Sequence, residues 1–72
     1  MTRNDIRKGE HLTLTSYGNG TAYVLIGPDI DLFWQGHDAD IFRSELEAVE
    51  LSSPDLATDE ALYRAADPYL YN

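Results

Sequence analysis

The alternation of apolar and polar residues around a glycine-rich turn is the feature that most limits how this chain can fold. Residues His11 to Tyr17 alternate with the period of a half-buried β-strand, and Thr21 to Ile26 is rich in the β-branched and aromatic residues that favour strands. Gly18-Asn19-Gly20, between these segments, tolerates positive φ angles. The pattern therefore predicts a β-hairpin.

Two registers are compatible with this hairpin. A two-residue turn at Asn19-Gly20 pairs Leu14 with Leu25, whereas a three-residue Gly18-Asn19-Gly20 loop pairs Leu14 with Val24. The second register is preferred because it separates an apolar face from a more polar one. It places Leu12, Leu14, Ala22, Val24 and Ile26 on one face and Thr13, Thr15, Tyr17, Thr21 and Tyr23 on the other.

A third strand is expected after the turn signal Gly27-Pro28-Asp29, because proline favours a turn and lacks the donor that a central strand needs. The segment then alternates until Gly36-His37, so one face can extend the core. The residues expected to point inward are Ile30, Leu32 and Trp34. Those expected to point outward are Asp29, Asp31 and Phe33.

Two helices are expected after the strands. Asp38 is a suitable N-cap for a helix that runs to about Glu50, with Asp40 near the positive end of the helix dipole. A shorter helix over about Asp59 to Ala66 is expected to end at Asp67-Pro68, since proline disfavours helical geometry in the preceding residue. The apolar arc of the first helix contains Ile41, Phe42, Leu46 and Val49. Glu45 projects beside that arc and is expected to reach water.

Alternatives remain open near the C-terminus. Both Ser53-Pro54-Asp55 and Thr58-Asp59-Glu60 are signals for the start of the second helix. The final residues Tyr69-Leu70-Tyr71-Asn72 either close the core or form an exposed contact patch, and packing is favoured in so small a protein. Residues 1–9 are expected to form a flexible N-terminus.

The predicted architecture is a single α+β domain over residues 1–72, with a three-stranded antiparallel sheet followed by two helices (β-β-β-α-α). A chain of this length buries only ~60% of its unfolded surface, so a deep cleft is not expected. The sequence contains no cysteine, which excludes disulfides and thiolate–zinc sites. Stability must therefore come from packing or from assembly.

The charge distribution is strongly asymmetric. The chain carries thirteen acidic and five basic residues, and ten of the acids lie between Asp29 and Glu60, where Arg43 is the one base. Most other bases, Arg3, Arg7 and Lys8, belong to the first eight residues. A negative field repels phosphates and attracts surfaces rich in lysine and arginine. Direct binding of nucleic acid is therefore disfavoured.

Neither a metal site nor an active site is predicted. His37, Asp38 and Asp40 are close in sequence but lack a thiolate and the helical His-x-x-x-His spacing. A calcium loop that begins at Asp29 would have Trp34 where glycine is required. The sequence contains no nucleophile elbow and no glycine-rich phosphate loop, so we expect no enzymatic activity and no cofactor.

No segment has the character of a membrane span or a signal peptide. The longest apolar run, Ala22 to Ile26, is far shorter than a bilayer crossing, and no long apolar stretch follows the charged N-terminus. A cytoplasmic protein without a membrane partner is therefore expected. The absence of cysteine is compatible with a reducing compartment.

The remaining interpretation is a protein-binding function. Carboxylates with phosphate-like spacing could occupy a basic groove of a nucleic-acid-processing protein, and neighbouring aromatic residues could anchor the contact. The candidate partner-binding residues are Asp29, Asp31, Asp38, Asp40, Glu45, Glu47, Glu50, Tyr69 and Tyr71. The alternative is an interaction or assembly module that uses an apolar patch of Tyr69, Leu70 and Tyr71, with the acids serving solubility alone.

In size, absence of cysteine, acidic segment and α+β pattern, the chain resembles small acidic inhibitors encoded by phages and mobile elements. These include anti-CRISPR and anti-restriction proteins that mimic nucleic acid. The resemblance implies a basic protein target and an inhibitory role. It assigns no individual binding residue.

Overall fold

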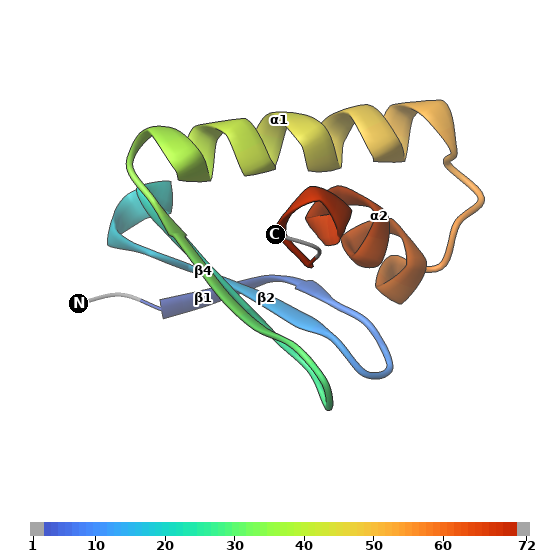
Figure 1. The fold of residues 1–72 in the computed structure, drawn as a ribbon, viewed down its shortest axis with the longest axis horizontal. Coiled ribbons are helices and arrows are strands. Elements are labelled where there is room, and N and C mark those ends of the chain that lie inside the picture. The colour runs from blue at the N-terminus through green and yellow to red at the C-terminus, as the bar shows by residue number, and fades with distance from the viewer. Residues whose placement is uncertain (1–2, 71–72) are drawn as a thin grey trace.

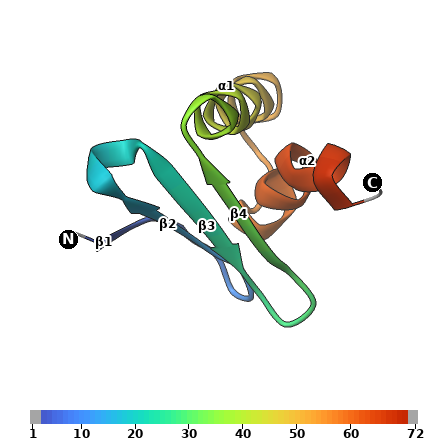
Figure 2. The ribbon, with the colours of Figure 1, turned by 60° about the vertical axis from the view of Figure 1, so that its left-hand side comes forward.

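A four-stranded antiparallel sheet carries two helices on one of its faces in the computed structural model, which describes residues 3–70 (Figures 1 and 2). The strands follow one another in the order β1-β2-β3-β4, each paired with the next. The elements are β1 Arg3–Lys8, β2 Thr13–Tyr17, β3 Ala22–Ile26, β4 Asp31–Gln35, α1 His37–Ser52 and α2 Thr58–Leu70. The α+β class and the order of sheet then helices are as predicted, but the sheet has four strands, not three.

The additional strand, β1, lies in the segment that was expected to be a flexible N-terminus. It pairs with β2, with Asn4 opposite Ser16 and Lys8 opposite Thr13, and the pairing shifts at a bulge between Asp5 and Arg7. Local sequence does not predict this strand because the segment is highly charged. Its stability comes from pairing with the next strand along the chain and from contacts of its side chains with the core and with α1.

The hairpin adopts the first of the two registers compatible with the sequence, not the one that was preferred. Leu14 pairs with Leu25, and Tyr17 pairs with Ala22, around a short turn that includes the 3₁₀ segment Gly18–Gly20. Gly18 and Gly20 have φ angles of 57° and 89°, which glycine tolerates without strain. This register buries Tyr23 and Leu25 beside Leu14 and leaves Ala22, Val24 and Ile26 on the opposite face. The larger side chains enter the core because they remove more apolar area from water.

Strand β4 alternates as predicted. Ile30, just before the strand, and Trp34 are buried, and Leu32 is half-buried, while Asp31 and Phe33 are exposed. Trp34 stacks on Phe42 of α1 with 3.8 Å between ring centroids. This contact fixes α1 against the edge of the sheet.

Helix α1 begins differently from the prediction. Its N-cap is Gly36, at φ 62° and ψ −130°, and no side chain caps the helix, so Asp38 lies within the first turn. The buried residues are Ala39, Phe42 and Leu46. Ile41, which was assigned to the core, is 41% exposed because the helix is rotated toward the side of Ala39.

Helix α2 is longer at its C-terminal end than predicted. It starts at Thr58, whereas Ser53 lies at the C-cap of α1, and it continues through Pro68 to Leu70. Proline removes one backbone donor, yet the helix persists because Tyr69 packs edge-on against Trp34 and Phe42. Small alanines on the inner face let α2 approach its neighbours closely. The buried residues of α2 are Ala61, Leu62, Ala65 and Ala66.

Candidate protein-binding surface

The exposed side of α1 carries two rows of carboxylates. Residues seven apart lie about 10.5 Å apart along the helix axis and nearly on the same side of it. Asp38 and Glu45 therefore form one row, and Asp40 and Glu47 form a second. All four are exposed, and we refer to them together as the acidic face of α1. Between the rows lie the exposed residues Ile41, Ser44 and Ala48.

One base contacts the acidic face. Arg43 Nε lies 3.3 Å from Glu47 Oε2, and Arg43 Nη1 donates to the Tyr23 hydroxyl at 3.0 Å. The hydrogen bond to Tyr23 contributes most to raising the pKa of Arg43. Arg43 is thus held between the helix and the sheet.

The other carboxylates of the acidic face have no partner within the described part of the chain. The carboxylates of Asp38, Asp40 and Glu45 make no hydrogen bond and no ion pair with any group of residues 3–70. Asp38 and Asp40 gain some stabilisation from the positive end of the helix dipole. Glu45, in the middle of the helix and exposed as predicted, has no such structural use.

Glu50, another predicted partner-binding residue, is engaged inside the fold. Its carboxylate accepts hydrogen bonds from Arg7 Nε at 2.7 Å and from Arg7 Nη2 at 3.0 Å. These bonds hold the pKa of Glu50 below its ordinary value and raise the pKa of Arg7. The pair ties β1 to α1, which explains an acid near the negative end of the helix dipole.

Asp29 and Asp31 are separated from the acidic face. Both are exposed, in the β3–β4 turn and at the start of β4, whereas α1 begins just after the other end of that strand. A five-residue strand is about 17 Å long. Asp31 also lies on the sheet face opposite the helices, in register with Ile26. The predicted acidic set therefore belongs to more than one surface.

Of the two predicted partner-binding tyrosines, Tyr69 lies within the described residues. Tyr69 is half-buried, with its ring centroid 5.3 Å from that of Trp34 in an edge-on contact. Tyr71 lies outside the described residues. Leu70 is 38% exposed.

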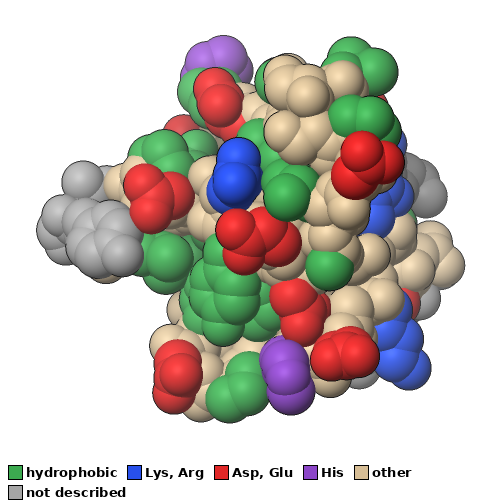
Figure 3. All heavy atoms as spheres, turned by 90° about the vertical axis from the view of Figure 1, so that its right-hand side faces the viewer, with side chains coloured by type: hydrophobic (Ala, Val, Ile, Leu, Met, Phe, Trp, Pro, Cys, Tyr) green, Lys and Arg blue, Asp and Glu red, His purple; other side chains and the backbone are tan. Residues whose placement is uncertain are grey.

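Acidic side chains also occupy the end of the molecule where α1 ends and α2 begins. Figure 3 shows this side, with carboxylates separated by hydrophobic side chains and few basic groups. Here Glu60 is 3.6 Å from Arg64, while Asp55 is exposed and has no partner among residues 3–70. Asp59, in contrast, accepts hydrogen bonds from the backbone amides of His11 and Leu12 at 2.9 and 3.0 Å. Sequence pattern did not predict this last contact because it joins distant segments.

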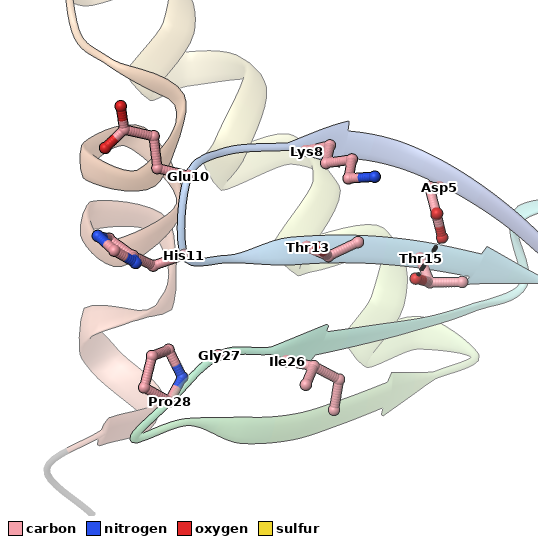
Figure 4. Close-up of a pocket in the computed structure, with 9 residues that line it drawn as sticks. All are labelled: Asp5, Lys8, Glu10, His11, Thr13, Thr15, Ile26, Gly27 and Pro28. Carbon is pink, nitrogen blue, oxygen red and sulfur yellow. Dashed lines mark hydrogen bonds between the residues drawn. The ribbon is translucent and has the colours of Figure 1, made fainter.

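Hollows in the surface are shallow. The one drawn in Figure 4, about 600 Å³, lies over one end of the sheet face that the helices leave open. The Thr15 hydroxyl donates to Asp5 in it at 2.9 Å, and Lys8 and His11 lie at its rim. Within residues 3–70, no three histidine or acidic side chains gather as a metal site would require.

Comparisons with models of protein families, with curated proteins and with solved structures found no match to this chain. No helix in the described part is long and apolar enough to cross a membrane.

Proposed function

We propose that the protein is a small inhibitor that binds another protein through the acidic face of α1. Its target would be a nucleic-acid-processing protein or complex, whose basic groove the carboxylates would occupy in place of phosphates. Binding blocks the groove without any reaction. The proposal requires no cofactor and no direct contact between this chain and nucleic acid.

The observation that carries the proposal is that three carboxylates on the exposed side of α1 have no neutralising partner among residues 3–70. Arg7, Arg43 and Arg64 contact other acids of the chain instead. Within residues 3–70 no basic side chain pairs with Asp38, Asp40 or Glu45, so an external partner can reach these exposed carboxylates. Charges arranged in this way accelerate encounter with a basic surface and make the association sensitive to salt.

The alternative, an assembly module that uses Tyr69, Leu70 and Tyr71, has weaker support. The ring of Tyr69 contacts both Trp34 and Phe42, so part of its surface is committed to the core. Leu70 is exposed, but a single exposed leucine is common on soluble proteins.

Affinity capture at low and high salt tests the proposal. The wild-type protein is immobilised, exposed to lysate and eluted with rising NaCl, and recovered proteins are assayed for loss of nucleic-acid binding. We expect a basic nucleic-acid-binding protein to be retained at low salt and released at high salt. Recovery of no such protein at either salt would refute the inhibitor function.

A charge reversal with a matched control locates the surface. Glu45→Lys should weaken capture at least about tenfold, since it converts an attraction to a repulsion. Asp55→Lys makes the same change of charge in the α1–α2 loop and should have a much smaller effect. Circular dichroism confirms that both variants fold. Equal effects of the two substitutions would indicate general charge attraction and not a defined face.

A further inference from the structure

The sheet face opposite the helices, which we call the open sheet face, forms a regular grid of side chains. Pairing across the four strands generates its rows. One row contains Lys8, Thr13, Ile26 and Asp31. The middle row contains Asp5, Thr15, Val24 and Phe33, and the third includes Tyr17, Ala22 and Gln35.

Apolar side chains are concentrated on this face although no helix or strand of residues 3–70 covers it. Phe33 is 58% exposed and Ile26 is 46% exposed, and Val24 between them is half-buried. A hollow of about 420 Å³ opens between Tyr17 and Phe33, with the small side chain of Ala22 among its lining residues. Contiguous exposed apolar area of this kind marks an interaction surface.

The two charges of the first row, Lys8 on β1 and Asp31 on β4, have opposite sign, and β1 also carries Asp5 in the middle row. Lys8 on β1 and Asp31 on β4 share one row, and three strand spacings of about 4.8 Å separate them by roughly 14 Å. Neither side chain has an ion-pair partner within residues 3–70. A surface whose opposite edges carry complementary charges can complement a copy of itself.

We propose that the open sheet face is the interface of a homodimer, in which a second copy of this chain packs its own open sheet face against it. The two-fold axis runs parallel to the strands, midway between the sheets. This operation places β1 of one copy opposite β4 of the other while keeping each row opposite the same row. Lys8 of each copy then faces Asp31 of the other, so that two ion pairs close the edges.

The positions of Lys8 and Asp31 favour a two-fold axis parallel to the strands over one perpendicular to them. Packed sheets keep their strand directions within about 30° of each other, so the axis is either parallel or perpendicular to the strands. The perpendicular axis places the row of Lys8 over the row of Tyr17, Ala22 and Gln35, which contains no carboxylate. The parallel axis alone pairs opposite charges.

The same axis also matches side-chain shape. It sets β2 of one copy opposite β3 of the other, so Tyr17 lies over Ala22 of the second copy in the third row. The Tyr17 ring of one copy thus enters the hollow above Ala22 of the other. In the middle row, Val24 lies over Thr15 of the second copy and Phe33 lies over Asp5, whose carboxylate accepts the hydrogen bond from the Thr15 hydroxyl. The helices lie on the other side of each sheet, so the acidic face of α1 stays outside the dimer.

Sedimentation velocity over a range of protein concentrations tests the dimer. The wild-type chain should show a reversible monomer–dimer equilibrium. Phe33→Ser should raise the dimer dissociation constant at least about tenfold, because it truncates the most exposed large apolar side chain of this face. Leu51→Ser removes a leucine that is 84% exposed at the end of α1 and should leave the dissociation constant unchanged. Circular dichroism establishes that each variant is folded.

Exchanging the charges of Lys8 and Asp31 tests whether these two residues pair across the dimer interface. Lys8→Asp and Asp31→Lys should each weaken the dimer, and the double variant should regain most of the wild-type affinity because each ion pair is restored with reversed sign. A wild-type chain that stays monomeric at every concentration would overturn the proposal. So would a dimer that Leu51→Ser dissociates, or a double variant no better than the single ones. These readouts do not depend on target binding, so the dimer and the inhibitor function can fail separately.

Discussion

At the scale of single residues, the carboxylates of this chain divide by whether the fold uses them. Glu50 and Asp59 hold distant segments together, the first through Arg7 of β1 and the second through backbone amides of the β1–β2 loop. The Glu45 carboxylate has no such contact in the part of the chain that the structure describes. The division matters because a structural acid and a binding acid respond differently to substitution and to pH.

The Arg7–Glu50 pair should contribute a pH-dependent part of the stability. Glu50→Gln is expected to lower the free energy of unfolding by about 1 kcal/mol at neutral pH, a modest value because the pair is one-third exposed. The pKa of Glu50 is depressed in the folded state, so its contribution is complete above the ordinary glutamate value and is lost as pH falls through the depressed value. Urea unfolding at neutral and acidic pH measures the difference from wild type.

Glu45→Gln is the matched control for this measurement. It removes the same charge from the same helix without breaking a contact, so its effect at neutral pH should be within about 0.5 kcal/mol. A difference between Glu50→Gln and wild type that stays constant down to strongly acidic pH would contradict the linkage.

At the scale of elements, backbone geometry at the β4–α1 junction and packing at the end of α2 decide where the helices begin and end. Gly36 adopts a positive φ that turns the chain directly from strand to helix without a side-chain cap. Pro68 lies inside α2, which local preference would have ended there. In the second case, the burial of the Tyr69 ring among other aromatics outweighs the loss of one backbone hydrogen bond.

Gly36→Ala should destabilise the protein by about 1–3 kcal/mol because an L-residue is strained at this backbone conformation. The cost would be conformational and not steric, since a Cβ at Gly36 meets no atom within 4 Å. A chemically synthesised chain with D-alanine at this position should retain wild-type stability, because the D-residue favours positive φ. Thermal unfolding compares the three chains. Equal destabilisation by both alanines would contradict the interpretation.

At the scale of the whole molecule, a short chain with a net charge of −8 repels itself and attracts basic surfaces. The sheet separates two surfaces of different character. The acidic face of α1 lies on one side of it, and the apolar open sheet face lies on the other. Binding through the first should weaken with salt. Dimerisation through the open sheet face should persist at high salt, because salt does not screen the burial of apolar side chains.

Moderate NaCl should raise the thermal unfolding midpoint above its value at low ionic strength. The physical reason is that salt screens repulsion among carboxylates that lack basic partners, and this outweighs the weakening of exposed pairs such as Arg43–Glu47. Differential scanning fluorimetry in NaCl and KCl at equal ionic strength measures the effect. Equal shifts indicate screening, while a fall in the midpoint would contradict a dominant self-repulsion.

Much of the fold follows from local patterns. The alternation of β4, with Trp34 inward and Phe33 outward, depends on strand periodicity, and the exposure of Glu45 follows from the cost of burying an unpaired charge. The class of fold and the order of sheet then helices follow in the same way. These features need only a residue and its neighbours in sequence.

Other features depend on pairing and packing that a segment's own residues do not reveal, and the tertiary structure alone decided them. Strand β1 exists because β2 pairs with it and α1 holds Arg7, neither of which a charged segment shows by itself. The hairpin register follows from which side chains fill the space beneath the helices, and a one-residue shift reverses every face. Thus, the sequence by itself determined strands β2, β3 and β4, the presence of two helices and the strongly negative charge of the chain. The fold decided which apolar residues entered the core, and so left Phe33, Val24 and Ile26 together on an open sheet face.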